Sequence, residues 1–305
     1  MTADAQRISV VVVTFNSAED IAGSLPPLVA QLATGDELIV VDNASTDDTQ
    51  AIVSTVAPTA KLIDTGANLG FAPACNIGVA QSCNELIVLL NPDATAGHGL
   101  LNQIRIGDTT GVSMALVLAE GGEIVNTSGG VTHFTGVSWA GGAGSPAATA
   151  PTAPTPVSFA SGACLVVRRD TWNRLGGFPD RYFMYCEDLD LSLRARLVGL
   201  PVTVTPTARV DHDYEFVKGS LKWKMLERNR ISTVLRTFPL PLLVAVLPAM
   251  VATDLAIWLV AWRGGWLGAK ASATVETLRD LPMTLSERCE IQQSRTVTSR
   301  EFATG

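Results

Sequence analysis

The sequence predicts an α/β fold with a mainly parallel sheet and helices on both faces. Two observations carry this expectation. Runs of branched aliphatic residues, such as Ile8 to Thr14, alternate with stretches of helical pattern, and each run ends in a polar turn. Continuous apolar runs of this kind are typical of parallel strands that are buried on both faces. The order of strand, turn and helix then repeats along the first third of the chain, as in doubly wound sheets.

The expected elements follow in order. Strands are expected at residues 8–14, 37–41, 61–64 and 85–90, with helices at about 18–32, from about 48, and at about 73–83. Further strands are expected at 111–118, 159–167 and 201–205, with a helix at 169–175. Residues 128–156 are rich in Gly, Ala, Thr and Pro, which predicts a mobile loop, either a passive linker or a lid that orders on substrate binding.

The composition narrows the function classes. The chain has 305 residues, enough for one large α/β domain or two smaller ones. Its net charge is -7 and no basic stripe interleaved with aromatic residues occurs, so nucleic acid is not expected as a partner. The five cysteines form no CxxC or Cys/His zinc pattern, which favours reduced thiols in a cytosolic compartment. A hydrophobic fraction of 47% calls for a search for membrane segments.

Polar residues follow the expected strands. In open α/β sheets ligands bind beyond the carboxyl ends of the strands. A single polar residue there is usually a cap or a turn residue, but polar clusters after four successive strands indicate a binding site. No GxGxxG or Walker sequence follows the first strand, so neither a dinucleotide site nor a P-loop is supported. The candidate residues are Thr14, Asn16, Asp42, Asn43, Asp47, Asn68, Asn91 and Asp93.

An acidic cluster opens a helix later in the chain. Glu187, Asp188 and Asp190 follow the aromatic run that starts at Tyr182. Acidic residues stabilise a first helical turn, because the helix dipole is positive there. A carboxylate at a helix start beside aromatic rings can also act as a general base. The residues alone leave both interpretations open.

Six motifs carry a family resemblance. They are VVVTFN, VVDNASTDDT, GANLGFAPACNIG, LLNPD, GACLVVRR and GGFPDRYFMYCEDLDLSLRARLVG. In this order they resemble the motif series of family-2 glycosyltransferases, and within it the bacterial rhamnosyltransferase-like enzymes of cell-wall and O-antigen assembly. The resemblance covers about Ile8 to His212. It implies the GT-A fold, a Rossmann-like fold of nucleotide-diphospho-sugar transferases, and an inverting, nucleotide-sugar-dependent reaction.

The resemblance also implies roles for individual residues. Asp188 would be the catalytic base and Glu187 its neighbour in the acidic pair, while Asp190 would be structural. Thr14 and Phe15 would line the base pocket, and Asp42 would bind the uracil or thymine edge. The whole set implied to bind the donor nucleotide is Thr14, Phe15, Asn16, Asp42, Asn43, Asn68, Gly70 and Asn91.

A divalent metal, Mg²⁺ or Mn²⁺, is implied as cofactor. Asn91-Pro92-Asp93 stands where the family places its metal-binding DxD, but the first position is Asn, so one anionic ligand is missing. Asp93 would remain a ligand, and His212 in the family position would complete the site. One or two protein ligands together with a diphosphate are ordinary for Mg²⁺, and a neutral imidazole is a suitable metal ligand.

The last part of the chain is basic and then apolar. Arg228 and Arg230 lie in a stretch that resembles lipid-acceptor members of the family, and are candidates to bind a phosphate or the acceptor. A solvated helix face is the alternative. Residues 240–262 are long enough to cross a bilayer, but Asp254 opposes insertion. An interfacial or re-entrant hairpin, a true span and a buried core helix all remain open.

These inferences combine into one hypothesis. Residues 1–215 form a GT-A domain, with a nucleotide-binding half at 1–95 and an acceptor or catalytic half at 96–215, and 216–305 form a helical, membrane-associated region. The protein would transfer L-rhamnose from dTDP-rhamnose to a lipid-linked glycan acceptor in cell-envelope polysaccharide synthesis. It would act on the cytoplasmic face of the plasma membrane, peripherally or through one membrane segment. The alternatives are a UDP- or GDP-sugar donor, or a non-catalytic nucleotide-sugar-binding homologue.

Overall fold

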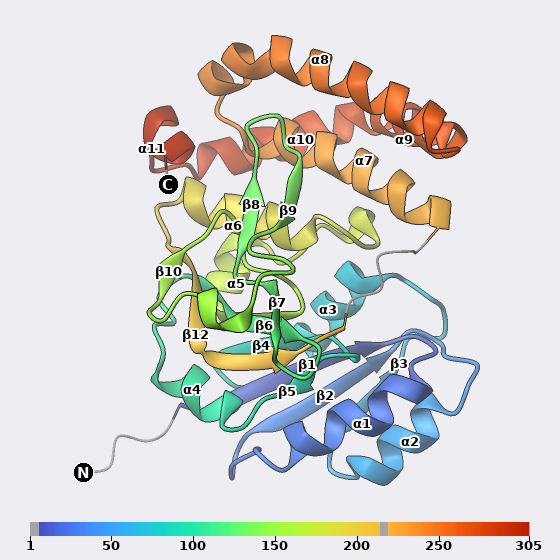
Figure 1. Cartoon of the computed structure of the whole chain (residues 1–305), viewed down its shortest axis with the longest axis vertical. Coiled ribbons are helices and arrows are strands. Elements are labelled where there is room, and N and C mark those ends of the chain that lie inside the picture. The colour runs from blue at the N-terminus through green and yellow to red at the C-terminus, as the bar shows by residue number, and fades with distance from the viewer. Residues whose placement is uncertain (1–5, 214–218, 305) are drawn as a thin grey trace.

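A large mixed sheet lies at the centre of the computed structural model, which describes residues 6–213 and 219–304 (Figure 1). The strands of the described residues that join this sheet are β1 (Ile8–Thr14), β2 (Glu37–Asp42), β3 (Lys61–Asp64), β4 (Leu86–Leu90), β5 (Thr95–Ala96), β6 (Val112–Ala119), β7 (Ile124–Thr127), β10 (Thr155–Pro156), β11 (Cys164–Arg168) and β12 (Val202–Asp211). Their order is β10-β12-β6-β11-β4-β1-β2-β3, with β5 paired to β12 and β7 paired to β6.

The sheet is parallel where the nucleotide site was expected. β4, β1, β2 and β3 run parallel, and Thr14, Asp42 and Asp64 are neighbours in register at their carboxyl ends. β11 then runs antiparallel between β4 and β6, and β12 is parallel to β6. The predicted mainly parallel α/β architecture is confirmed, and the antiparallel β11 makes the sheet a mixed one. The strand expected at 159–167 is shorter, because pairing with β4 begins only at Cys164, and the one expected at 201–205 continues to Asp211.

Helices cover the sheet and form a separate layer at one end of the molecule. Those of the first two-thirds are α1 (Ala18–Val29), α2 (Thr49–Val56), α3 (Phe71–Ala80), α4 (Leu100–Ile106), α5 (Arg169–Leu175) and α6 (Glu187–Leu197). Those of the last third are α7 (Gly219–Thr237), α8 (Leu240–Arg263), α9 (Leu267–Arg279), α10 (Leu281–Gln293) and α11 (Ser299–Thr304). Figure 1 shows α8 at the end of the long axis, with α7 and α10 between it and the sheet.

Residues 128–156, expected to form a mobile loop, contain regular structure. β8 (Gly130–Thr132) and β9 (Ser138–Ala140) form an antiparallel hairpin, and a 3₁₀ turn follows at Ala147–Thr149. Main-chain hydrogen bonds join Gly130 to Phe159 and Val125 to Ser145. Composition predicts disorder when little apolar surface can be buried, but here the small residues let backbones pair closely, and the hydrogen bonds supply the order.

A second apolar core joins α6 to the C-terminal helices. Its buried members come from both sides of residues 214–218 in the sequence. The expected domain boundary at 215 lies outside the described residues and stays a prediction. This core links the helix that carries the acidic cluster to the last third of the chain. The buried residues are Leu189, Leu193, Leu197, Val234, Phe238, Val246, Met250 and Phe302.

Helix α8 exposes most of its apolar surface. Among the described residues, α8 is the one helix that is long and apolar enough to cross a membrane, judged by length and composition. Its most apolar 18-residue segment has a mean hydropathy of 2.2, and only 11% of that segment is buried. It is therefore not a buried core helix. Leu240, Val244, Leu247, Val251, Leu255, Leu259 and Trp262 are exposed and recur at helical spacing, which defines an apolar stripe along one face.

The close contact of α3 with the sheet can be tested at Gly78. A Cβ at this position would lie 2.3 Å from Val11 Cγ1 and 3.1 Å from Val41 Cγ2. We expect Gly78→Ala to lower the free energy of unfolding by about 1–3 kcal/mol, because it overpacks a filled core. The matched control is Gly23→Ala in α1, where nothing lies within 4 Å, and an increase of about 0.5–1 kcal/mol is expected. Urea denaturation measures both, and equal changes of the same sign would contradict this packing.

Candidate active site

Asp42 lies fully buried at the end of β2, next to Thr14. Its Oδ1 accepts hydrogen bonds from Thr14 Oγ1 at 2.7 Å and Ser45 Oγ at 2.6 Å. Its Oδ2 accepts from Ser45 N at 2.9 Å and Gln50 Nε2 at 2.8 Å. Burial alone would raise the pKa of Asp42, but the hydrogen bonds from Ser45, Gln50 and Thr14 outweigh it and lower that pKa.

These four donors use the acceptor positions of the Asp42 carboxylate. A pyrimidine edge that reached Asp42 would have to replace one of them. The sequence does not predict the contact from Gln50, because a polar residue in the first turn of α2 carries no sign that it will reach the end of β2. The binding of the base by Asp42 therefore stays a prediction, with Gln50 as the group that would have to move.

The turn after β1 is exposed. Phe15 has 47% of its surface exposed, so its ring is available to stack on a base. Asn16 adopts a left-handed conformation with φ 51, and its Oδ1 accepts a hydrogen bond from Thr46 N at 2.8 Å. The turns after β1 and β2 thus form one surface, as expected for polar residues that follow neighbouring parallel strands.

Asn43 holds the loop that precedes α3. Its Nδ2 donates to Gly70 O at 3.1 Å, and Asn68 Oδ1 accepts from Gly70 N at 3.0 Å. Asn43 is buried and Asn68 is exposed. Gly70 has φ 92, and a Cβ there would lie 2.5 Å from the backbone oxygen of Phe183. This close approach, which needs glycine, joins the loop before α3 to the loop that leads into α6.

Asp93 and His212, the two expected metal ligands, lie together. Asp93 follows β4, His212 follows β12, and Asp93 Oδ1 is 3.0 Å from His212 Nε2. The His212 side chain is 4% exposed and that of Asp93 is 30% exposed, so the pair is reached from one side. Asn126 Nδ2 donates to His212 O at 2.7 Å and fixes the strand end.

A carboxylate and an imidazole fit a divalent cation that takes its remaining ligands from a diphosphate and water. Within residues 6–213 and 219–304, no group of three or more His, Cys, Asp or Glu side chains could hold a metal without such help. The donor set therefore fits a cation brought together with the nucleotide, and metal binding by Asp93 and His212 stays a prediction.

The acidic pair lies at the start of α6. Asp188 is half-buried, and its carboxylate accepts from Gly162 N at 3.0 Å and Leu189 N at 2.7 Å. Burial raises the pKa of Asp188 in spite of these hydrogen bonds. Burial and the charge of Asp188 raise the pKa of Glu187 well above its ordinary value. Glu187 is 6% exposed, and no donor among the described residues contacts its Oε2.

A short turn links Asp188 to the end of β4. Ala163 O accepts a hydrogen bond from Asn91 N at 3.1 Å, and the preceding Gly162 donates to Asp188. The structure thus connects Asn91, of the expected donor site, with the expected base. The sequence shows small residues before β11, but it does not identify the Gly162 N–H as the group that orients the Asp188 carboxylate.

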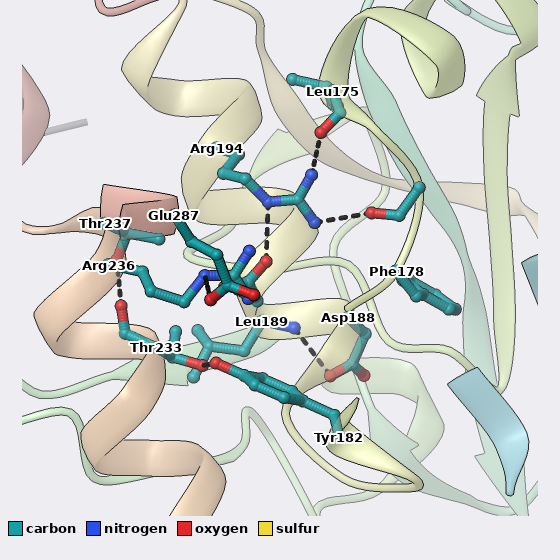
Figure 2. A network of polar contacts seen from close by, with 12 residues as sticks. Leu175, Phe178, Tyr182, Asp188, Leu189, Arg194, Thr233, Arg236, Thr237 and Glu287 are labelled. Atoms are coloured by element: carbon teal, nitrogen blue, oxygen red, sulfur yellow. Dashed lines mark hydrogen bonds and ion pairs between the residues drawn. The ribbon is translucent and has the colours of Figure 1, made fainter. Parts of the chain in front are cut away.

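Asp190 is fully buried and forms ion pairs on two sides. Its carboxylate lies 2.6 Å from Arg194 Nε and 3.2 Å from Arg236 Nη1. Arg194 also donates to the carbonyls of Leu175 and Gly177, which closes the end of α5. Figure 2 shows this network together with Thr233, whose hydroxyl lies 2.8 Å from that of Tyr182. These contacts agree with a structural role for Asp190.

Arg228 and Arg230 are occupied by protein groups. Arg228 donates to the carbonyls of Arg181 and Tyr182 at 2.7 and 3.2 Å. Arg230 is buried, pairs with Glu227 at 2.8 Å and contacts Asp254 at 3.2 Å. A phosphate would have to displace these partners, so the present contacts do not support the phosphate or acceptor role, which stays a prediction.

Similar known proteins identify the family of this chain. The sequence pattern of Glycosyl transferase family 2 matches residues 9–171, more than half of the 305-residue chain. The chain belongs to this family. It is similar to the N-acetylglucosaminyl-diphospho-decaprenol L-rhamnosyltransferase of Mycobacterium tuberculosis, with 29% identity over 231 residues that cover 67% of this chain and 75% of that one.

Solved structures show the same fold. GalNAc-T7 with UDP, GalNAc and Mn²⁺ has a TM-score of 0.64 at 13% identity, over 78% of this chain and 49% of that one. The mannosyltransferase PcManGT of Pyrobaculum calidifontis, with GDP-Man and Mn²⁺, has a TM-score of 0.55 at 20% identity, over 90% and 87%. The GT-A fold class is confirmed, and the protein is a glycosyltransferase.

The unsatisfied burial of Glu187 predicts a stability effect. Its pKa in the folded state is raised, so the folded protein holds a proton there that the unfolded chain loses near pH 4.5. Stability should therefore fall as the pH rises from about 4.5 towards the raised pKa. We expect Glu187→Gln to remove this fall and to raise the free energy of unfolding at pH 7 by about 1–3 kcal/mol. Thermal unfolding between pH 4.5 and 8 measures it, and a variant less stable than the wild type at pH 7 would contradict the burial argument.

Proposed function

We propose that this family-2 glycosyltransferase transfers L-rhamnose from dTDP-rhamnose, with inversion, to a lipid-linked glycan acceptor in cell-envelope polysaccharide synthesis. The observation that carries the reaction type is the half-buried Asp188 carboxylate, held by Gly162 and Leu189 and linked through Ala163 to the end of β4. The transferred sugar and the acceptor are supported by the similar mycobacterial protein, whose name specifies L-rhamnose and N-acetylglucosaminyl-diphospho-decaprenol.

The reaction is a single displacement at the anomeric carbon. The acceptor hydroxyl oxygen forms a bond to that carbon while the bond from carbon to the diphosphate oxygen breaks. The hydroxyl proton goes to Asp188, and the nucleoside diphosphate leaves with the bonding electrons. No covalent intermediate is needed, so one base suffices, in contrast to a retaining glycosidase with two carboxylates. The raised pKa of Asp188 brings the base closer to neutral pH, where proton transfer is most efficient.

Asp93 and His212 are the residues that would hold a divalent cation, Mg²⁺ or Mn²⁺. When bound, such a cation compensates the charge of the leaving diphosphate. The chain's own contribution is to hold the carboxylate and imidazole 3.0 Å apart at the ends of β4 and β12. Because Asn91 supplies no charge, two protein ligands would carry the site together with the donor.

The test of the base is Asp188→Asn. A thermal-shift panel of dTDP-, UDP- and GDP-sugars, with and without Mg²⁺ or Mn²⁺, first selects the donor by stabilisation. We expect the variant to lose about 10²–10⁴-fold in kcat, because a general base contributes that much. Nucleotide affinity should stay unchanged. Transfer to N-acetylglucosaminyl-diphospho-decaprenol measures kcat, and near wild-type turnover would show that Asp188 is not the base.

We also propose that α8 lies in the membrane interface on the cytoplasmic side rather than spanning the bilayer. Its apolar stripe is exposed, whereas Asp254 faces the protein and pairs with Lys270 at 2.5 Å and Arg230 at 3.2 Å. Crossing the bilayer would break these pairs and cost about 2.5–3.5 kcal/mol for the aspartate alone. Trp262 is 65% exposed at the end of the stripe, where aromatic rings favour the headgroup level.

Leu255→Glu tests this surface. Leu255 is 66% exposed in the stripe, and burying its side chain in lipid contributes about 1.5–3 kcal/mol, so the variant should bind vesicles about tenfold more weakly or worse. Ile106→Glu is the matched control, since Ile106 is 71% exposed on α4, away from α8. Flotation with phosphatidylethanolamine–phosphatidylglycerol vesicles measures binding. Equal weakening by both variants would contradict the proposed surface.

A further inference from the structure

The loop that leads into α6 has an unusual backbone. Phe183, Tyr185 and Cys186 have φ values of 60, 69 and 66, a region that L side chains rarely adopt. Cys186 is the residue directly before α6, so the helix that carries Asp188 starts from this loop. Such a conformation persists only where the surrounding structure fixes it from several sides. The groups that fix the loop therefore decide where α6 begins.

Asn229 of α7 fixes this loop with one side chain. The residue is fully buried, and its Nδ2 donates to the carbonyls of Tyr182, Met184 and Tyr185 at 3.0, 2.9 and 2.8 Å. An amide nitrogen has two hydrogens, so three converging carbonyls share them. The Asn229 Oδ1 accepts from Arg228 Nε at 3.0 Å, which sets the orientation of the amide.

The carbonyl groups of the loop are then all accounted for. Arg228 Nη2 binds the carbonyls of Arg181 and Tyr182, and Asn229 binds those of Tyr182, Met184 and Tyr185. Phe183 O accepts from Ala72 N at 3.1 Å at the start of α3, and Cys186 O accepts from Asp190 N at 2.9 Å in α6. Two neighbouring side chains of α7, together with these backbone N–H groups, hold the whole stretch. The left-handed conformation thus depends on α7, which lies beyond residue 218 in the sequence.

This loop also touches the expected donor side. A Cβ at Gly70 would lie 2.5 Å from both Cδ2 and the backbone oxygen of Phe183. Two residues after the loop, the Asp188 carboxylate receives the Gly162 N–H. The same backbone therefore borders the nucleotide loop at one end and the base at the other.

We propose that Asn229, oriented by Arg228, is a positioning residue for sugar transfer. It holds residues 182–186 in the one conformation that places Asp188 against Gly162, in reach of the acceptor hydroxyl. This inference rests on the proposed role of Asp188 as the base. It gives the Glu227-Arg228-Asn229-Arg230 stretch a task other than phosphate binding.

The test compares Asn229→Ala with Val234→Ala. Val234 is also buried on α7, about 140° around the helix from Asn229, in the second apolar core. Both variants should lower the melting temperature. We expect Asn229→Ala to lower kcat about 100-fold, the cost of a displacement of about 1 Å at a reacting group, with unchanged dTDP affinity. Val234→Ala should keep kcat within about twofold, since it leaves the loop untouched. Arg228→Lys keeps the positive charge but loses some of the guanidinium N–H donors, so its kcat should lie between those of the two alanine variants.

A double variant separates this inference from the proposed function. If Asn229 acts through Asp188, Asn229→Ala should not lower the residual rate of Asp188→Asn further. A full additional 100-fold loss would overturn the inference, as would equal kcat values for Asn229→Ala and Val234→Ala. Turnover by Asp188→Asn at the wild-type rate would instead overturn the base itself.

Hydrogen exchange gives a readout that needs no substrate. The amides of residues 183–189 should exchange faster in Asn229→Ala than in Val234→Ala, because only the first variant releases the loop. Equal exchange in this segment would show that Asn229 does not hold it, even if the variant is too unstable for kinetic work.

Discussion

The buried ion pairs of Asp190 fix α6, the helix that carries the proposed base Asp188. One partner, Arg194, lies on α6 itself and also closes the end of α5, while the other, Arg236, belongs to α7. Removal of one partner from such a buried pair typically costs about 3–5 kcal/mol, because an uncompensated charge remains. The sheet carries the expected donor edge, but the proposed base keeps its place because α6 is bound to α7 through Asp190 and Arg236.

Helix α7 therefore serves two parts of the molecule at once. Arg228 and Asn229 contact the loop before the base, and Glu227 and Arg230 contact Lys270 and Asp254 of the outer helices. Adjacent residues of one helix thus connect the proposed site of sugar transfer with the apolar stripe of α8, the proposed membrane surface. A change in the packing of α8 would reach the proposed base Asp188 through one helix, α7.

The sequence predicts those parts of the fold that local pattern determines. Ile8–Thr14 and the next three runs appear as strands within one residue at each end, because buried parallel strands carry continuous apolar residues. Asp93 and His212 meet as the family pattern implies. Pattern did not reveal the hairpin at 130–140, because its pairing rests on main-chain hydrogen bonds, including those between Gly130 and residues 158–159, and not on an apolar pattern. Nor could it reveal Asn229, whose three acceptors lie more than 40 residues away.

The ion pairs of Asp254 have a consequence for how α8 can rotate. Asp254 lies 2.5 Å from Lys270 of α9 and 3.2 Å from Arg230 of α7, so two other helices hold its carboxylate at once. A rotation of α8 about its own axis would break both pairs together and leave the carboxylate without its cations. These two contacts therefore keep the apolar stripe of α8 on the exposed side of the helix.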